Sequence, residues 1–340
     1  MVSKNPLVQK IAGGGIGREL LQYLLDRHLA FTDEEYLESL VFVLSDPGAE
    51  KRAREMLGLI PPPVKLQYVQ KRDADLKVAD FILQEALDSG DAAILSLIIQ
   101  NQGYPAEFLL RIAAQGGSAV LESMLENQVR LIAFPEIMER MEANPACNPY
   151  IRGRVKELRD FYLQPKAAEA IPETEIIEEL ATIAAEEKKK DPQLDVEQVK
   201  KDALTSLQRI NLMGVSERVR LALTGNKTDR LVLIKDANKI VQAAVLDSPK
   251  MADDEVLIHV RNLSLPGEII GKIANNREWT KNYTIVLALV ENPKTPVNRA
   301  LGFVKQLHDR DLKLLARDRN VSPVIRVLAQ NLEKQKEKVK

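Results

Sequence analysis

The sequence predicts an all-α protein assembled from short helix pairs, an α-solenoid of HEAT-like repeats. Apolar residues recur at helical spacing almost throughout, as in Val297, Ala300, Leu301, Val304 and Leu307, and no segment sustains the alternation of a β-strand. Turn residues recur at steps of 14, 14, 16 and 28 positions from residue 248 to residue 320. A fixed period of this size is typical of solenoids, in which stacked repeats supply one continuous core.

Residues 1–160 are expected to form a first helical repeat lobe. A helix is predicted over Arg18–Leu25, after a flexible turn at residues 13–17, and a helix pair over Thr32–Pro61 with its turn at residues 46–48. The run Pro61-Pro62-Pro63 should stop the second helix of that pair, because proline cannot continue a helix.

Residues 161–200 differ in composition and are predicted to be an acidic helical connector. Six glutamates follow Pro172, while Ile176, Ile177, Leu180 and Ile183 still form a narrow apolar stripe. A second, basic helical lobe is expected over residues 201–335, followed by a fraying helix end at residues 336–340. The chain should therefore have two repeat lobes with a connector between them.

The second lobe carries the clearest punctuation, at Asn262–Pro266, Asn292–Pro296 and Asn320–Pro323. Asparagine tolerates the left-handed conformation that ends a helix, serine or threonine can cap the next helix, and proline fits its first turn. The same phase predicts an aliphatic core ladder that consists of Leu289, Leu301, Val304, Leu315 and Ile325.

Two segments carry a resemblance to known repeats. Leu287-Ala-Leu-Val-Glu-Asn-Pro-Lys-Thr-Pro296 and Leu314-Leu-Ala-Arg-Asp-Arg-Asn-Val-Ser-Pro323 resemble the repeats of bacterial HEAT-like and leucine-rich-repeat-variant proteins. The similarity is clearest over residues 200–335 and looser over residues 30–160. It implies a scaffold that binds other macromolecules, and it assigns no functional residue, because the matched positions are turns and core.

The charge of the chain is divided unevenly, although its net charge is only −1. Residues 201–340 hold 25 Lys and Arg against 16 Asp and Glu, whereas residues 161–200 hold 5 against 10 and residues 1–160 hold 18 against 23. A basic part beside acidic parts suggests an anionic partner, or contact between the parts of the chain.

Motifs for chemistry are weak, so we expect no catalytic residue, cofactor or metal. The glycine run at residues 13–17 lacks the preceding strand of a dinucleotide site and the Lys-Ser/Thr of a P-loop. His28, His259 and His308 are far apart in sequence and are expected at the surface or in turns. The acidic cluster Asp253-Asp254-Glu255 is expected to begin a helix.

The single cysteine, Cys147, excludes an internal disulfide and a cysteine-based zinc site. The first 15 residues lack the apolar core of a signal peptide, and no apolar run is long enough to span a bilayer. We therefore expect a cytoplasmic protein without a membrane segment.

Two groups of residues in the second lobe are candidates for binding a partner. Arg277, Trp279 and Tyr283 bring together residue types that dominate binding hot spots, although Trp279 could equally fill the core between repeats. Arg310, Lys313 and Arg317 share one helix face, which could also be a solvated surface. Four arginines lie near equivalent places in neighbouring repeats and could align along one basic ridge: Arg261, Arg277, Arg319 and Arg326.

The most direct functional hypothesis is a non-catalytic scaffold that binds a protein, which could be acidic, on a groove or ridge of the repeats. The alternative is nucleic-acid binding by the basic lobe. A third class is a HEAT-like enzyme that acts on DNA bases, for which Trp279 with Tyr283 is the only trace.

Overall fold

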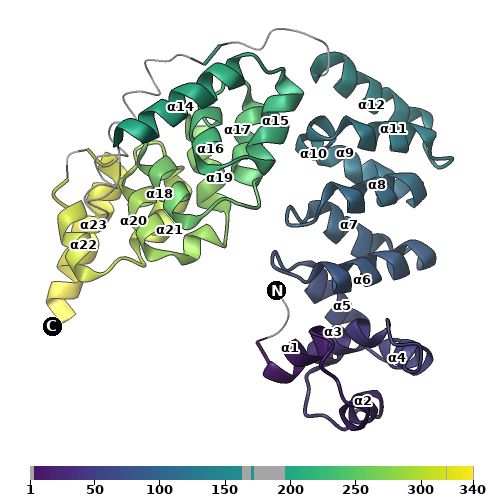
Figure 1. The fold of residues 1–340 in the computed structure, drawn as a ribbon. Coiled ribbons are helices and arrows are strands. Elements are labelled where there is room, and N and C mark those ends of the chain that lie inside the picture. Colours follow the sequence, from purple (N-terminus) through teal and green to yellow (C-terminus); the bar gives the residue numbers. More distant parts are fainter. Residues whose placement is uncertain (1–3, 163–169, 172–195, 319, 340) are drawn as a thin grey trace. The chain divides into compact units, whose positions relative to one another are not determined.

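The computed structural model describes four stretches of the chain, residues 4–162, 170–171, 196–318 and 320–339. Helices and turns account for these residues, which include no strand (Figure 1). The predicted all-α class is therefore confirmed. The chain divides into two compact units, Met1–Gln164 and Pro165–Lys340. None of the described helices combines the length and the apolar character that crossing a membrane requires.

The first unit is a succession of short helices. They are α1 (Pro6–Ala12), α2 (Arg18–Leu25), α3 (Asp33–Val43), α4 (Glu50–Leu57), α5 (Pro62–Val69), α6 (Leu76–Ser89), α7 (Ala92–Gln100), α8 (Ala106–Gln115), α9 (Ser118–Glu126), α10 (Gln128–Ala133), α11 (Pro135–Ala143) and α12 (Pro149–Tyr162). The predicted helix over Arg18–Leu25 and the pair with its turn at residues 46–48 are confirmed as α2 and as α3 with α4.

The second unit has the same character. Its helices are α14 (Val196–Asn211), α15 (Val215–Thr224), α16 (Lys227–Leu233), α17 (Lys239–Asp247), α18 (Asp253–Arg261), α19 (Gly267–Asn275), the 3-10 helix η1 (Trp279–Lys281), α20 (Tyr283–Glu291), α21 (Val297–Val304), α22 (Asp309–Leu315) and α23 (Pro323–Val339). Residues 196–200, assigned from the sequence to the connector, belong to α14, and the end of α23 contains residues 336–339. The rest of the predicted connector, including its apolar stripe, falls mainly outside the described residues.

Helices that are next but one in the sequence pack against each other within each unit. In the first unit α5 contacts α7, which contacts α9, and α6 contacts α8. The pattern shifts at α8, which contacts α11, because two helices, α9 and the six-residue α10, lie between them in the sequence. In the second unit α15, α17 and α19 follow the same pattern, and α18 packs on α20. The helices of one pair thus contact helices of the pair before it, and Figure 1 shows this succession within each unit.

The predicted core ladder of the second unit is confirmed at four of its five positions, Leu289, Val304, Leu315 and Ile325. At the fifth position, Leu301, the side chain is only partly buried. On α21 the buried positions are Ala300, Phe303 and Val304, while Val297 is 47% exposed. The apolar stripe of this eight-residue helix is therefore rotated toward Phe303, which is buried where Leu301 is only partly so.

The turns at residues 262–266, 292–296 and 320–322 lie between helices as predicted, but their asparagines do not adopt the left-handed conformation. Asn262 and Asn292 have φ of −75° and −77°, with extended ψ. Asn292 is selected for its side chain instead: its Oδ1 accepts from the N–H of Lys294 at 2.8 Å, and its Nδ2 donates to the carbonyl of Val260 at 2.6 Å. The asparagine thus closes its own turn and ties it to the end of α18, one helix pair earlier.

The first unit uses the same side-chain device. Asn101 donates to the carbonyls of Val69 and Lys71 at 2.8 and 2.9 Å, and Asn144 donates to those of Ala113 and Gly116 at 2.9 and 3.0 Å. Their Oδ1 atoms accept from the N–H groups two residues further on. These bonds join residues 28–32 positions apart, which is one helix pair.

Prolines and histidines correct two further expectations. The proline run was predicted only to stop a helix, but Pro62 is the first residue of α5. Proline fits there because a residue at the first helical position needs no N–H. Pro266 and Pro296 occupy the position just before the first residue of their helices, without a serine or threonine cap. His259 was expected at the surface or in a turn, but it is fully buried on α18.

Candidate interaction surface on α22

Tyr283, at the start of α20, reaches the first turn of α22. Its hydroxyl donates to Asp311 Oδ2 at 2.5 Å and accepts from the backbone N–H of His308 at 3.1 Å. The Tyr283 and His308 rings are stacked, with their centroids 4.3 Å apart. Burial, followed by the bond to Asp311, raises the pKa of the Tyr283 phenol, so the phenol stays protonated at neutral pH. These contacts hold α22 against α20.

Trp279 lies in η1, which packs between α19 and α20, and only 4% of its surface is exposed. The sequence left two alternatives for Trp279, a contact with a partner or a place in the core, and its indole lies in the core. Arg277 is exposed in the preceding turn, and its guanidinium forms no hydrogen bond or ion pair with any described residue. The structure thus separates Trp279 from the surface on which a partner could bind.

Arg310, Lys313 and Arg317 are exposed on α22 and in the turn that follows it. The guanidinium groups of Arg310 and Arg317 have no hydrogen-bond or ion-pair partner among residues 4–162, 170–171, 196–318 and 320–339. Leu314, four residues after Arg310 and three before Arg317, is 63% exposed. Residues four apart in a helix share one face, so Arg310 and Leu314 lie on the same face of α22. Arg317 lies in the turn two residues after the end of the helix, not on the helix face predicted for it. We call Arg310, Leu314 and Arg317, with the neighbouring Lys313, the α22 surface.

The sequence analysis missed Leu314, although the run Leu312-Lys313-Leu314-Leu315 contained a usable signal. Leu312 and Leu315 are buried, at 2% and 3% exposure. Three leucines within four residues cannot all face the core of one short helix, so one of them had to point outward. Exposed basic residues on both sides mark Leu314 as that one.

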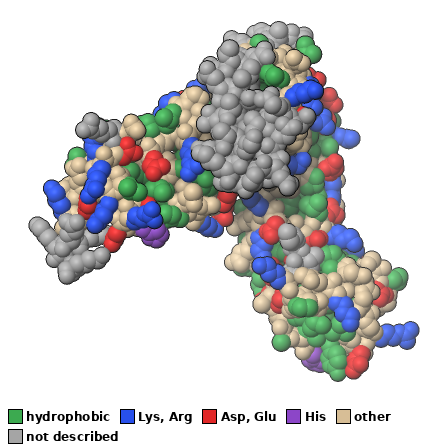
Figure 2. Space-filling model, turned by 60° about the vertical axis from the view of Figure 1, so that its left-hand side comes forward, with side chains coloured by type: hydrophobic (Ala, Val, Ile, Leu, Met, Phe, Trp, Pro, Cys, Tyr) green, Lys and Arg blue, Asp and Glu red, His purple; other side chains and the backbone are tan. Residues whose placement is uncertain are grey.

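Charges of both signs surround the α22 surface. The pKa of Glu291, at the end of α20, is raised by burial and by Asp318 and Asp311, against the opposing effect of Arg261. An Arg326 guanidinium nitrogen donates to the backbone carbonyl of Asp318 at 3.4 Å. Figure 2 shows blue basic and red acidic side chains interspersed on the visible face of the second unit. The ridge suggested by Arg261 and Arg326 is therefore mixed in charge, and Arg319 of the same ridge lies outside the described residues.

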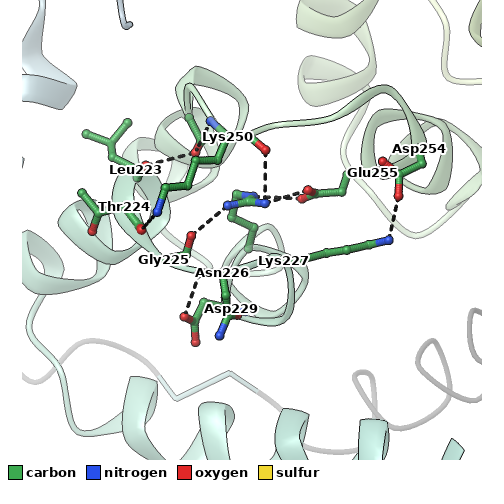
Figure 3. A network of polar contacts seen from close by, with 11 residues as sticks. Leu223, Thr224, Gly225, Asn226, Lys227, Asp229, Lys250, Asp254 and Glu255 are labelled. Atoms are coloured by element: carbon green, nitrogen blue, oxygen red, sulfur yellow. Dashed lines mark hydrogen bonds and ion pairs between the residues drawn. The ribbon is translucent and has the colours of Figure 1, made fainter. Parts of the chain in front are cut away.

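A second polar constellation in this unit lies in the core. Arg230 on α16 forms a bidentate pair with Glu255 on α18, at 2.9 and 2.6 Å, and donates to the carbonyl of Gly225 at 2.9 Å. Figure 3 shows the Glu255 carboxylate and the backbone carbonyls of Gly225 and Lys250 directed at this guanidinium. Arg218, which is fully buried, pairs with Asp236 at 2.7 Å. Glu255 thus begins its helix, as predicted, and also neutralises a buried arginine.

This buried network has no opening toward solvent at its charged atoms, since Arg230 and Glu255 are both 4% exposed at the side chain. It joins α16 to α18 and belongs to the scaffold. Among the residues with a described position, no group of three or more His, Cys, Asp or Glu side chains could hold a metal ion. The glycine run forms the turn between α1 and α2, with Gly14 at φ 76°.

Comparison of the chain with protein-family models, with curated proteins and with solved structures finds no match. The function is therefore inferred from the residues and their arrangement alone.

Proposed function

We propose that the protein is a non-catalytic scaffold, an α-solenoid of HEAT-like helix pairs in two lobes, that binds an acidic protein in the cytoplasm. The single cysteine, which is free and buried, suits that compartment. The regular packing of helices next but one in the sequence supports the repeat architecture. Repeat scaffolds of this kind expose extended surfaces whose side chains select the partner.

One observation carries the proposal: Leu314 is 63% exposed between two arginines without an intramolecular partner in the described chain. An arginine that forms no internal pair is available for a bidentate bond to a carboxylate. An exposed leucine beside it can bury apolar area in the same contact. We therefore expect an acidic segment that presents a hydrophobic side chain to Leu314.

The test compares proteins captured from a lysate of the source organism by the unmodified chain and by Arg310→Glu/Arg317→Glu. We expect the double variant to lose acidic partners that the unmodified chain retains, because attraction becomes repulsion at two positions. Binding of the unmodified chain should also weaken as salt rises from about 0.05 to 0.5 M, since exposed charges are screened. Leu314→Asp should lose the same partners.

Lys201→Glu/Lys272→Glu is the matched control, because it reverses two exposed basic residues on other helices of the same unit, α14 and α19. It changes the net charge equally and should retain the partners. The free energy of unfolding should change by no more than about 1 kcal/mol in either double variant, since exposed charges contribute little to stability. Identical sets of captured proteins for all variants would refute the proposed surface.

Nucleic-acid binding remains the second candidate, supported by the excess of 25 basic over 16 acidic residues in residues 201–340. The mixed charges around Glu291, Asp311 and Asp318 weigh against a continuous phosphate track. Titration of the chain into a labelled single-stranded RNA and into a labelled DNA duplex, at several salt concentrations, distinguishes nucleic-acid binding from protein binding. Submicromolar binding that Arg310→Glu/Arg317→Glu abolishes would favour this second function.

A further inference from the structure

An open groove of about 810 Å³ lies in the first unit, between α6 and the last turns of α3 and α4. The residues that α6 contributes recur at every turn, from Lys77 through Phe81 and Glu85 to Asp88. The groove therefore follows one face of this 14-residue helix for about three turns, or roughly 16 Å. This length and volume are sufficient for several side chains of a ligand.

The floor of the groove is apolar. Phe42 and Leu44 come from the end of α3, Leu57 from the end of α4, and Phe81 from the middle of α6. Phe42, Leu44 and Phe81 are only partly buried, so part of each side chain faces the groove. A ligand that covered them would gain the transfer free energy of this apolar area.

Most of the charged side chains along the groove already have partners in the first unit. Asp80 pairs with Arg111, and both Glu85 oxygens accept from Lys65 Nζ at 2.7 Å. Arg54 donates to Glu50 at 3.1 Å. These pairs are satisfied without a ligand, so they form a neutral polar rim.

Two charges of opposite sign remain, at the two ends of the α6 face. The Lys77 ammonium lies 5.8 Å from the Phe42 ring centroid and has no carboxylate partner among the described residues. The Asp88 carboxylate accepts only from the Gln84 amide, at 2.8 Å. The C-terminal end of α6 adds partial negative charge near Asp88. The groove therefore has a positive end, an apolar middle and a negative end.

We propose that this groove docks an amphipathic α-helix of another protein, with a carboxylate directed at Lys77 and a basic residue directed at Asp88. Apolar side chains of that helix, spaced by one turn, lie on Phe42 and Phe81. A helix suits the site because the groove runs beside α6 over its length, and helices pack side by side at 8–10 Å. The site belongs to the first unit and does not depend on the role of the α22 surface.

The probe is a displayed library of random 14-residue peptides, selected on the full chain. Enriched peptides should carry apolar residues at helical spacing, flanked by an acidic and a basic residue about three turns apart. Their affinities for the unmodified chain and its variants are then measured by fluorescence anisotropy. Phe81→Asp should abolish binding, and circular dichroism shows whether this variant is still folded.

A charge exchange gives the decisive comparison, because Lys77 and Asp88 are exposed and their replacement leaves the core intact. Lys77→Glu/Asp88→Lys should bind the selected peptides at least about tenfold more weakly, since two attractions become repulsions. Peptides with their acidic and basic residues exchanged should recover the lost affinity on this variant. Glu126→Lys/Lys156→Glu, an exchange at exposed positions outside the groove, should bind like the unmodified chain.

Two results would overturn the proposal. One is a selection that enriches no peptide on the unmodified chain over the Lys77→Glu/Asp88→Lys variant. The other is a set of enriched peptides that bind both proteins equally and gain nothing from exchange of their charges. Either result would leave the α22 surface untouched, because its variants and readout are separate.

Discussion

His259 has no exposed surface, and neither of its ring nitrogens has a hydrogen-bond partner in the described part of the chain. Burial, followed by the positive charges of Arg230 and Lys227, lowers the pKa of its imidazole to about 4. The folded protein therefore stabilises the neutral form of the imidazole over the protonated form. His259 lies four residues after Glu255 on α18. The Glu255 carboxylate is already paired with Arg230 and does not contact the imidazole by a hydrogen bond.

The depressed pKa predicts a pH-dependent stability. In the unfolded chain the imidazole takes up its proton near pH 6.5, whereas the folded chain resists it down to about pH 4. Stability from this residue is therefore complete above about pH 6.5 and decreases as the pH falls toward 4, by about 3 kcal/mol. Urea unfolding at pH 7 and pH 4.5 measures the decrease.

His259→Leu should remove this part of the pH dependence, because leucine has no proton to bind. His28→Gln, which changes a histidine that is not fully buried, should retain it. An equal loss of stability between pH 7 and pH 4.5 in His259→Leu and in the unmodified chain would contradict the assignment.

Asn144 provides a second prediction for a single side chain. Asn144→Ala removes two bonds to the carbonyls of Ala113 and Gly116 and one from the N–H of Ala146, and leaves buried acceptors without a donor. The free energy of unfolding should fall by about 2–4 kcal/mol in urea titrations. Gln115→Ala, at an exposed position of the same unit, should change it by less than about 0.5 kcal/mol. A similar small effect of both variants would exclude a bridging role for Asn144.

At the scale of single helices, α21 shows how far the sequence pattern reaches. Its existence and its bounding turns followed from Asn292–Pro296, but its rotation did not. An eight-residue helix has barely two turns, so its apolar stripe is compatible with two neighbouring phases. In the phase that the structure adopts, the larger Phe303 side chain is buried and Leu301 is only partly buried.

The corrected phase predicts different costs for two leucines of the second unit. Leu289→Ala, at a fully buried position, should lower the free energy of unfolding by about 2–5 kcal/mol. Leu301→Ala should cost only about 1–2 kcal/mol, because part of this side chain is already in water. Urea unfolding followed by circular dichroism compares them. Equal costs would mean that Leu301 is packed as tightly as Leu289.

The candidate surface was only partly predictable for a similar reason. Arg310 and Lys313 could be placed on an exposed helix by spacing alone, whereas Arg317 lies in the turn after that helix. The burial of Trp279 depends on how η1 packs between α19 and α20, and the bond from Tyr283 to Asp311 joins residues 28 positions apart. Contacts between helices that are distant in sequence, such as the pair of Arg230 with Glu255, leave no comparable mark in a single sequence.

At the scale of the whole molecule, the division into Met1–Gln164 and Pro165–Lys340 predicts two separable folding units. Each unit has its own buried apolar core, which is the requirement for independent folding. Residues 1–164 and 165–340, expressed separately, should each show helical circular dichroism and a cooperative urea transition. A fragment that unfolds without cooperativity would show that its core needs the other unit.

The asparagine bridges have a further consequence for how such a chain can change in length. Apart from closing their own turns, the side chains of Asn101, Asn144 and Asn292 bond to backbone carbonyls at the end of the helix one pair earlier. Every junction therefore carries both halves of its own connection within about 30 residues. Duplication of one such segment in the gene would add a pair with matching donors and acceptors, whereas insertion of a single residue into a helix would rotate its apolar face. Growth by whole segments is thus the route that this architecture tolerates.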